Sequence, residues 1–373
     1  MEPFAAAIAR LTAGLSTFVA TRQVALGNLF LARFLPPVAS TTAEIRRGSF
    51  RIVTEPAALT AVDSPYAKVG SIRSADFSGE TFKLTAESKL SEGDQDAMHA
   101  RANAAIVRAY NDGGQADVQN VYEGFISRVI EDGVSLALDY GEEVFRAIAL
   151  ATGKIDVVDA NTGNTVQIDY GVPATHKVAR TTAAGGYDTA GSKFWEDNDT
   201  ARVRLGVEPT LITDPTTATK IKAQAANGII VTRREVLSPT VTREEWAQAA
   251  KNADGSFNTG QRSLDVRLST TVMIYGGRGD AEGAPYFWPA GRITALRVTN
   301  RETQLIDGQI VRGALGVTHI GPNTEEGQAS RRHLNVYRPE GRRYEVIAQG
   351  AEDIVPDIQE ARNLFLMQTE LTA

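Results

Sequence analysis

The run from Asp117 to Thr152 constrains the fold most, because its apolar residues recur every three or four positions over roughly ten helical turns. At about 1.5 Å per residue, such a helix spans about 50 Å. Asp117 can cap its start, and Gly153 stands where such a helix ends. The apolar stripe of its second half comprises Leu136, Tyr140, Val144, Ile148 and Ala151, and three glycines permit a bend: Gly124, Gly133 and Gly141. A long core helix of an ordinary enzyme is the alternative interpretation.

Composition limits the chemistry. The 373 residues are 42% hydrophobic and 23% charged, as in a soluble globular protein with one to three domains. The net charge of −6 argues against a dedicated nucleic-acid binder and is compatible with a container for DNA. There is no cysteine, and no two of the four histidines are three or four residues apart. We therefore expect no disulfide, no thiolate nucleophile, no metal site and no cofactor.

The N-terminus does not have the pattern of a signal peptide. Phe4 to Ala20 is apolar, but Glu2 stands where basic residues belong and Arg10 interrupts the run. No stretch of 18 uncharged apolar residues predicts a membrane span. We expect synthesis in the cytosol and no contact with a membrane.

The first ninety residues predict elements that cannot bury themselves. Residues 4–30 form one or two amphipathic helical pieces, and Leu35-Pro36-Pro37 then forces an extended exit. This arm is either a strap on another surface or a docked N-terminal helix. Strand-like alternation follows in 50–53 and 77–84, around a long connection. Two strands alone are marginally stable, so this excursion is either an ordinary edge hairpin or packs on a neighbouring subunit.

The rest of the chain alternates between helices and strands. Turn residues 159–164 predict a hairpin of 154–158 with 165–170, and Thr242 with Glu245 forms a capping box that predicts a helix over 242–251. The other predicted elements are a helix at 93–110, a surface loop at 179–193, a buried strand at 227–232, a strand within 264–275, a loop at 276–289, and strands at 292–298, 342–348 and 363–369.

No catalytic residues are predicted. Gly276-Gly277-Arg278-Gly279-Asp280 is neither a Walker loop nor a dinucleotide fingerprint, and its Arg-Gly-Asp tripeptide is either a turn or an adhesion motif. The carboxylates of residues 196–199 lack the glycine and distal glutamate of an EF-hand, which favours a solvated or helix-capping turn over a calcium site. Four basic doublets are either solvated or pair with neighbouring subunits or phosphate: Arg46-Arg47, Arg233-Arg234, Arg331-Arg332 and Arg342-Arg343.

The order of these parts resembles the major capsid proteins of tailed bacteriophages, specifically the lambda capsid protein E-like family with the HK97 fold. The resemblance covers essentially the whole chain through short motifs. These are Phe34-Leu35-Pro36-Pro37, Ala151-Thr152-Gly153-Lys154-Ile155, Val166-Gln167-Ile168-Asp169-Tyr170-Gly171, Trp195, and the segment from Phe287-Trp288-Pro289 through Gly313 to the closing strands.

The resemblance implies an α+β fold with four parts. These would be an N-terminal arm at 1–45, an E-loop at 46–92, a peripheral domain at 93–200 and 326–373 with a spine helix at about 117–152, and an axial domain at 201–325. Some relatives crosslink through Lys and Asn, but nothing near Lys68 or Lys83 marks either as reactive.

The function implied is a shell protein that forms hexamers and pentamers around double-stranded DNA, bound without sequence specificity. A scaffolding protein or domain, a portal and a decoration protein are the implied partners, and the virion is the implied location. Expected inter-subunit contacts are Phe4, Phe18, Phe34, Phe50, Ile52, Phe77, Phe82, Arg46 and Arg47. The alternatives are an encapsulin-type nanocompartment, a soluble α/β enzyme with a site near 276–289, and an adhesin using Arg278-Gly279-Asp280.

Overall fold

The computed structural model describes residues 29–39, 44–54, 70–80, 82–90, 92–112, 124, 126–127, 131–158, 165–250, 257, 264–278, 284–298, 302–306, 309–312, 315–321, 333–337 and 346–371. Some predictions lie outside these residues. They are the helical pieces before Leu29, the cap at Asp117, most of the helix between 117 and 130, Gly279-Asp280, and the doublets Arg331-Arg332 and Arg342-Arg343.

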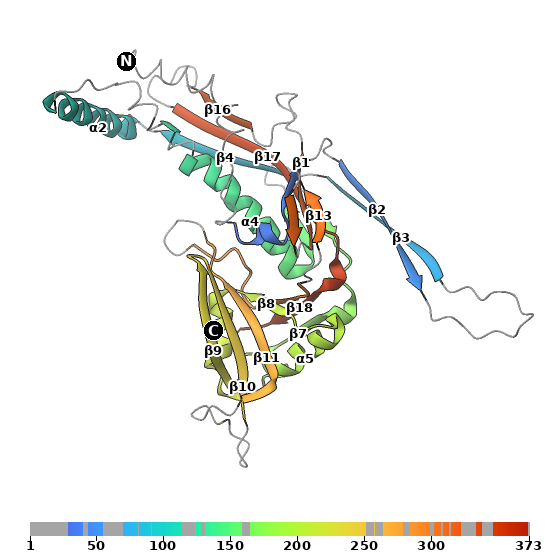
Figure 1. Cartoon of the computed structure of the whole chain (residues 1–373). Coiled ribbons are helices and arrows are strands. Elements are labelled where there is room, and N and C mark those ends of the chain that lie inside the picture. Colours follow the sequence, from blue (N-terminus) through green and yellow to red (C-terminus); the bar gives the residue numbers. More distant parts are fainter. Residues whose placement is uncertain are drawn as a thin grey trace, which may run out of the picture.

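Helix α4 (Leu136–Thr152) lies between two β-sheets and contacts strands of both (Figure 1). It ends as predicted at Gly153, whose φ of 68° is left-handed and whose N–H donates to Ala149 O at 2.9 Å. A π-helical turn, η2 (Glu131–Ser135), precedes it and contains Gly133. The regular α-helix is thus interrupted by a π-helical turn at Gly133, one of the three glycines at which a bend was expected to be permitted.

The first sheet has the order β1-β15-β17-β16, and β4 pairs with β17 as well. β1 runs parallel to β15, and the other pairs are antiparallel. The bounds are β1 (Pro37–Ala39), β15 (Gly316–Ile320), β17 (Val346–Ile358), β16 (His333–Tyr337) and β4 (Phe82–Leu90).

The second sheet has seven strands in the order β7-β18-β12-β8-β11-β10-β9. Their bounds are β7 (Lys177–Arg180), β18 (Leu364–Thr369), β12 (Arg292–Leu296), β8 (Thr210–Thr213), β11 (Leu264–Tyr275), β10 (Val241–Ala249) and β9 (Ile229–Ser238). Helix α5 (Phe194–Leu205) packs on β18 and β12, and α6 (Pro215–Ala223) packs on β11. Phe194, Trp246 and Phe365 belong to the apolar core beneath these helices.

Two elements project from this body (Figure 1). One is the antiparallel hairpin of β2 (Glu44–Thr54) and β3 (Gly70–Glu80), which confirms the two-stranded excursion. The other is α2 (Glu92–Asn111), predicted at 93–110. Its predicted apolar face, Ala97, Ala100, Ala104 and Val107, is exposed, while Met98 and Ala102 are buried.

The remaining described elements are short. β5 (Lys154–Val158) and β6 (Thr165–Asp169) form the predicted hairpin. A second hairpin joins β13 (Glu302–Ile306) to β14 (Gln309–Arg312). The short helical turns are η1 (Leu31–Arg33), η3 (Ala174–His176), η4 (Thr182–Ala184), η5 (Ala225–Asn227) and η6 (Ala361–Asn363). With both helices and sheets, the described chain has the mixed α+β architecture that was predicted.

Two predictions in the second sheet were wrong. Residues 242–251 were expected to be helical, but 241–249 form β10, which is paired on both sides. Its inward positions include Glu244, a buried carboxylate that hides the two-residue period of a strand in the sequence. The strand expected at 227–232 begins at Ile229 and is largely exposed, because β9 is the edge of the sheet.

A buried ionic junction and the exposed elements

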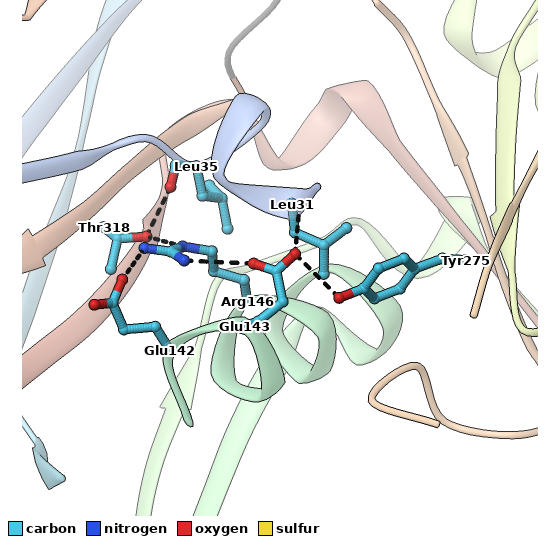
Figure 2. A network of polar contacts seen from close by, with 7 residues as sticks. All are labelled: Leu31, Leu35, Glu142, Glu143, Arg146, Tyr275 and Thr318. Atoms are coloured by element: carbon cyan, nitrogen blue, oxygen red, sulfur yellow. Dashed lines mark hydrogen bonds and ion pairs between the residues drawn. The ribbon is translucent and has the colours of Figure 1, made fainter. Parts of the chain in front are cut away.

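A buried ionic cluster lies on α4. Glu142, Glu143 and Arg146 are at most 1% exposed, and their spacing of three and four residues places them on one side of the helix. The Arg146 guanidinium donates to Glu142 through Nη2, and its Nη1 lies 3.4 Å from Glu143 Oε2 (Figure 2). Each carboxylate therefore has the arginine as a counter-charge away from water.

Arg146 joins the helix to the first sheet and to the N-terminal segment. Its Nε donates to Thr318 Oγ1 on β15 at 2.9 Å. The Thr318 hydroxyl then donates to the carbonyl oxygen of Leu35 at 2.8 Å.

Glu143 joins the helix to the N-terminal segment and to the second sheet. Its Oε1 accepts hydrogen bonds from the N–H of Leu31 at 2.7 Å and from the hydroxyl of Tyr275, the last residue of β11, at 3.1 Å. Figure 2 shows these residues converging on α4 from three sides. We call this set, Leu31, Leu35, Glu142, Glu143, Arg146, Tyr275 and Thr318, the junction.

Burial affects the pKa values of three groups of the junction: Glu143, Arg146 and Tyr275. Desolvation raises the pKa of Glu143, although Arg146 and the hydrogen bonds oppose the rise. Desolvation would lower the pKa of Arg146, but the adjacent carboxylates of Glu142 and Glu143 outweigh it and raise this pKa. Burial, with the negative charge of Glu143, also raises the pKa of the Tyr275 phenol. The charged Arg146 and the neutral Tyr275 hydroxyl can thus donate hydrogen bonds to Glu143. These bonds suit the junction to hold α4 and β11 together.

The segment before β1 belongs to the chain's own core. Leu31 and Leu35 are fully buried, and Phe34, 5% exposed, packs edge-on against Phe30. Phe34 is therefore occupied within its own chain, and we do not retain it as an inter-subunit contact. The choice between a strap on another surface and a docked N-terminal helix concerns residues 4–30, and residues 4–28 lie outside the described chain.

The other predicted contact residues lie on the projecting hairpin, on β4 or outside the described chain. Arg46, Arg47, Phe50 and Ile52 are in β2, and Phe77 is in β3, where it pairs with Arg47. Phe82 begins β4, while Phe4 and Phe18 are outside the described residues. Among the described elements, β2 and β3 make extensive contact with one another only. The hairpin thus gathers five of the nine predicted residues on a projecting element.

Of the three carboxylates within residues 196–199, Glu196 and Asp199 are exposed, in agreement with a solvated or helix-capping turn, whereas Asp197 is buried. All three occupy the first turns of α5, and Asp197 is 2% exposed. Arg180 Nε donates to Asp197 Oδ2 at 2.8 Å, and the buried Tyr187 hydroxyl donates to the same oxygen at 2.8 Å. In the described residues, no group of three or more ligand side chains could hold a metal ion. None of the helices described there is long and apolar enough to cross a membrane.

The sequence did not indicate the junction. Of the predicted stripe, Ala151 is buried but Leu136, Tyr140, Val144 and Ile148 are only half-buried, whereas the fully buried side of α4 carries the charged residues. One signal was present: Glu142 and Arg146 continue the four-residue spacing of the buried Leu138, and Leu150 follows four residues later.

The comparisons find similar solved structures but no similar sequence. No protein-family model and no curated protein matches the sequence. Among solved structures, a proposed prophage capsid protein from E. coli CFT073 matches with a TM-score of 0.55 and 11% identity, covering 96% of this chain and 99% of that one. The capsid of an empty GTA particle matches with a TM-score of 0.43, 14% identity and coverage of 94% and 92%.

A third structure, the capsid of the Myoviridae phage XM1, matches with a TM-score of 0.42, 12% identity and 91% coverage of each chain. The fold assignment rests on the first match, which pairs nearly complete chains. The chain therefore has the HK97-like fold of phage capsid proteins.

Proposed function

We propose that this chain is the major capsid protein of a tailed phage, and that it assembles into the hexamers and pentamers of an icosahedral shell around double-stranded DNA. The β2–β3 hairpin carries the proposal, because eleven residues of each strand form a ladder that has little contact with the rest of the described chain. A two-stranded ribbon is marginally stable in water, so it needs a partner surface. In a shell of identical subunits, each neighbour supplies that surface.

The proposal assigns roles to the parts of the chain. Residues 1–45 are the N-terminal arm and 46–92 the E-loop; residues 93–200 and 326–373 are the peripheral domain, and 201–325 the axial domain. Phe50, Ile52, Phe77, Phe82, Arg46 and Arg47 provide inter-subunit contacts, as do Phe4 and Phe18 of the arm. The shell works with a scaffolding protein or domain, a portal and a decoration protein, holds DNA without sequence specificity, and is located in the virion.

The protein is structural under this proposal and catalyses no reaction. The stretch considered for an enzyme site, 276–289, supports this view in its described part. Arg278 and Tyr286 form a β-bridge across it, and Trp288 is 1% exposed, with its indole N–H donated to Arg292 O at 2.9 Å. These contacts suit a packed connection.

Electron microscopy and size-exclusion chromatography of the purified chain, alone and co-expressed with its neighbouring genes, test the proposal. We expect shells, tubes or capsomer rings of megadalton mass. A 40.1 kDa monomer that stays monodisperse under both conditions would refute it.

A further inference from the structure

The edge strand β9 presents an unusual concentration of exposed apolar side chains. Seven large hydrophobic side chains are exposed in the described residues, and three of them are on β9. Val231 is 39% exposed, Val236 69% and Leu237 40%. Since β9 is ten residues long and ends the seven-stranded sheet, these side chains form one narrow strip along its edge. A strip of this kind marks an interaction surface.

The backbone of β9 is poorly suited to accept another strand. Its pairing with β10 slips twice, and each slip places the extra residue in β9, at Thr232 and at Leu237. Such bulges bend and twist a strand, and charges between them, here Arg233 and Arg234, further discourage strand addition. A partner at this edge is therefore bound through side chains.

The two arginines on this edge are incompletely paired within the chain. Their side chains are 64% and 68% exposed. Arg233 lies 3.8 Å from Glu235 and 3.9 Å from Glu245, and Arg234 lies 3.6 Å from Glu244, all beyond hydrogen-bond distance. Glu244 is already engaged by Lys222 at 3.0 Å and by the Trp246 indole at 2.7 Å. Both guanidinium groups are thus able to donate hydrogen bonds to a carboxylate of another molecule.

A complementary surface lies on α5, on the other side of the same body in Figure 1. Glu196, Asp199 and Val203 are spaced by three and four residues, so they share the outer face of the helix. Their side chains are 61%, 46% and, for the whole residue, 69% exposed. Each acid has a partner three residues away in the same helix region, Lys193 or Arg202, but exposed pairs of this kind contribute little and are readily exchanged.

We propose that the β9 edge of one copy docks on the outer face of α5 in the next copy. Arg234 and Val236 share one face of β9, so Arg234 pairs with one of Glu196 and Asp199 while Val236 packs against Val203. Arg233, on the opposite face, reaches the other acid around the exposed edge of the strand. Because two different surfaces meet, the contact is head-to-tail, and it closes into a ring when the rotation between copies allows. The proposal rests on the proposed shell function and adds the surfaces by which neighbouring copies recognise each other.

The absence of cysteine makes a direct test possible. The variant carrying both Val203→Cys and Val236→Cys is assembled and treated with a short bismaleimide, beside each single variant. Head-to-tail docking predicts a ladder of linked oligomers for the double variant and no ladder for either single variant. A mixture of the two single variants should give dimers only. Shells without a ladder in the double variant would overturn the inference and leave the shell function intact.

A charge exchange tests the pairing of the two surfaces. Arg233→Glu with Arg234→Glu should abolish assembly, as should Glu196→Arg with Asp199→Arg, and the four changes together should restore it. Arg204→Glu, on α5 but off this face, is the matched control and should assemble normally. Normal assembly of either reversed variant, or no restoration in the combined one, would contradict the proposal. If the unaltered chain forms neither shells nor rings, both the shell function and this inference fail.

Discussion

At the scale of single residues, Arg146 has the largest predicted effect on stability. Its removal leaves Glu142 and Glu143 buried without their counter-charge and Thr318 without its donor. We expect Arg146→Met to lower the free energy of unfolding by about 3–5 kcal/mol, the usual result of breaking a buried ion pair. Denaturant unfolding followed by circular dichroism measures this. Lys154→Met is the control, because the Lys154–Asp156 pair is exposed, and no measurable change is expected.

Glu143 gives the junction a pH dependence. Its pKa in the folded chain is above the ordinary 4.5, to which it returns on unfolding. At a pH between the unfolded and the folded pKa of Glu143, the folded state binds a proton that the unfolded state has lost. The contribution of Glu143 to stability therefore falls as pH rises from the unfolded to the folded pKa.

The variant Glu143→Gln isolates this contribution. The stability of the variant relative to the unaltered chain should increase as pH rises from 4.5 through the folded pKa, and then level off. The test is the free energy of unfolding of the variant and of the unaltered chain, measured over this pH range. Parallel plots of the two free energies against pH would show that Glu143 does not titrate in this range.

At the scale of elements, close approach between η2 and β4 explains a glycine in the helical run. A Cβ added at Gly133 would lie 2.6 Å from the Ser88 Oγ of β4. We expect Gly133→Ala to destabilise the fold by about 1–3 kcal/mol through this overlap. Thermal unfolding should show partial recovery when Ser88→Gly is added.

Gly124 is the matched control for this prediction. It is helical, and nothing lies within 4 Å of an added Cβ. Gly124→Ala should therefore stabilise the chain by up to about 1 kcal/mol, the difference in helix propensity. Equal effects of the two alanine substitutions would contradict the close-packing explanation of Gly133.

Elements with a local signal could be predicted from the sequence, and those set by their neighbours could not. The end of α4 at Gly153 and the β5–β6 hairpin follow from turn chemistry over a few residues. The β10 strand does not, because the buried carboxylate of Glu244 is paired with Lys222, which is 22 residues away in the sequence and which the sequence does not place beside it. The junction was missed for the same reason: its seven residues come from four separate segments.

At the scale of the whole molecule, residues that build the fold are separate from those that build the assembly. Leu35 is fully buried in the subunit core, whereas Phe50 and Ile52 lie on the projecting hairpin. We expect Leu35→Ala to destabilise the isolated subunit by about 2–5 kcal/mol. Phe50→Ser with Ile52→Ser should leave the subunit's unfolding unchanged and abolish shell formation, because the hairpin loses apolar contact only with a neighbour.

Two measurements on the same preparations separate these effects: unfolding of the dissociated subunit, and the amount of large particles in sedimentation. Arg101→Ser provides a control for surface substitution in general. Arg101 is exposed and belongs to α2, a helix that is remote from the hairpin in Figure 1. If the hairpin variant unfolds earlier than the unaltered subunit, the hairpin packs on its own chain, and its role as the contact between subunits is wrong. If it unfolds normally and still forms shells, the contacts between copies lie elsewhere, and the β9 edge with the α5 face becomes the first place to look for them.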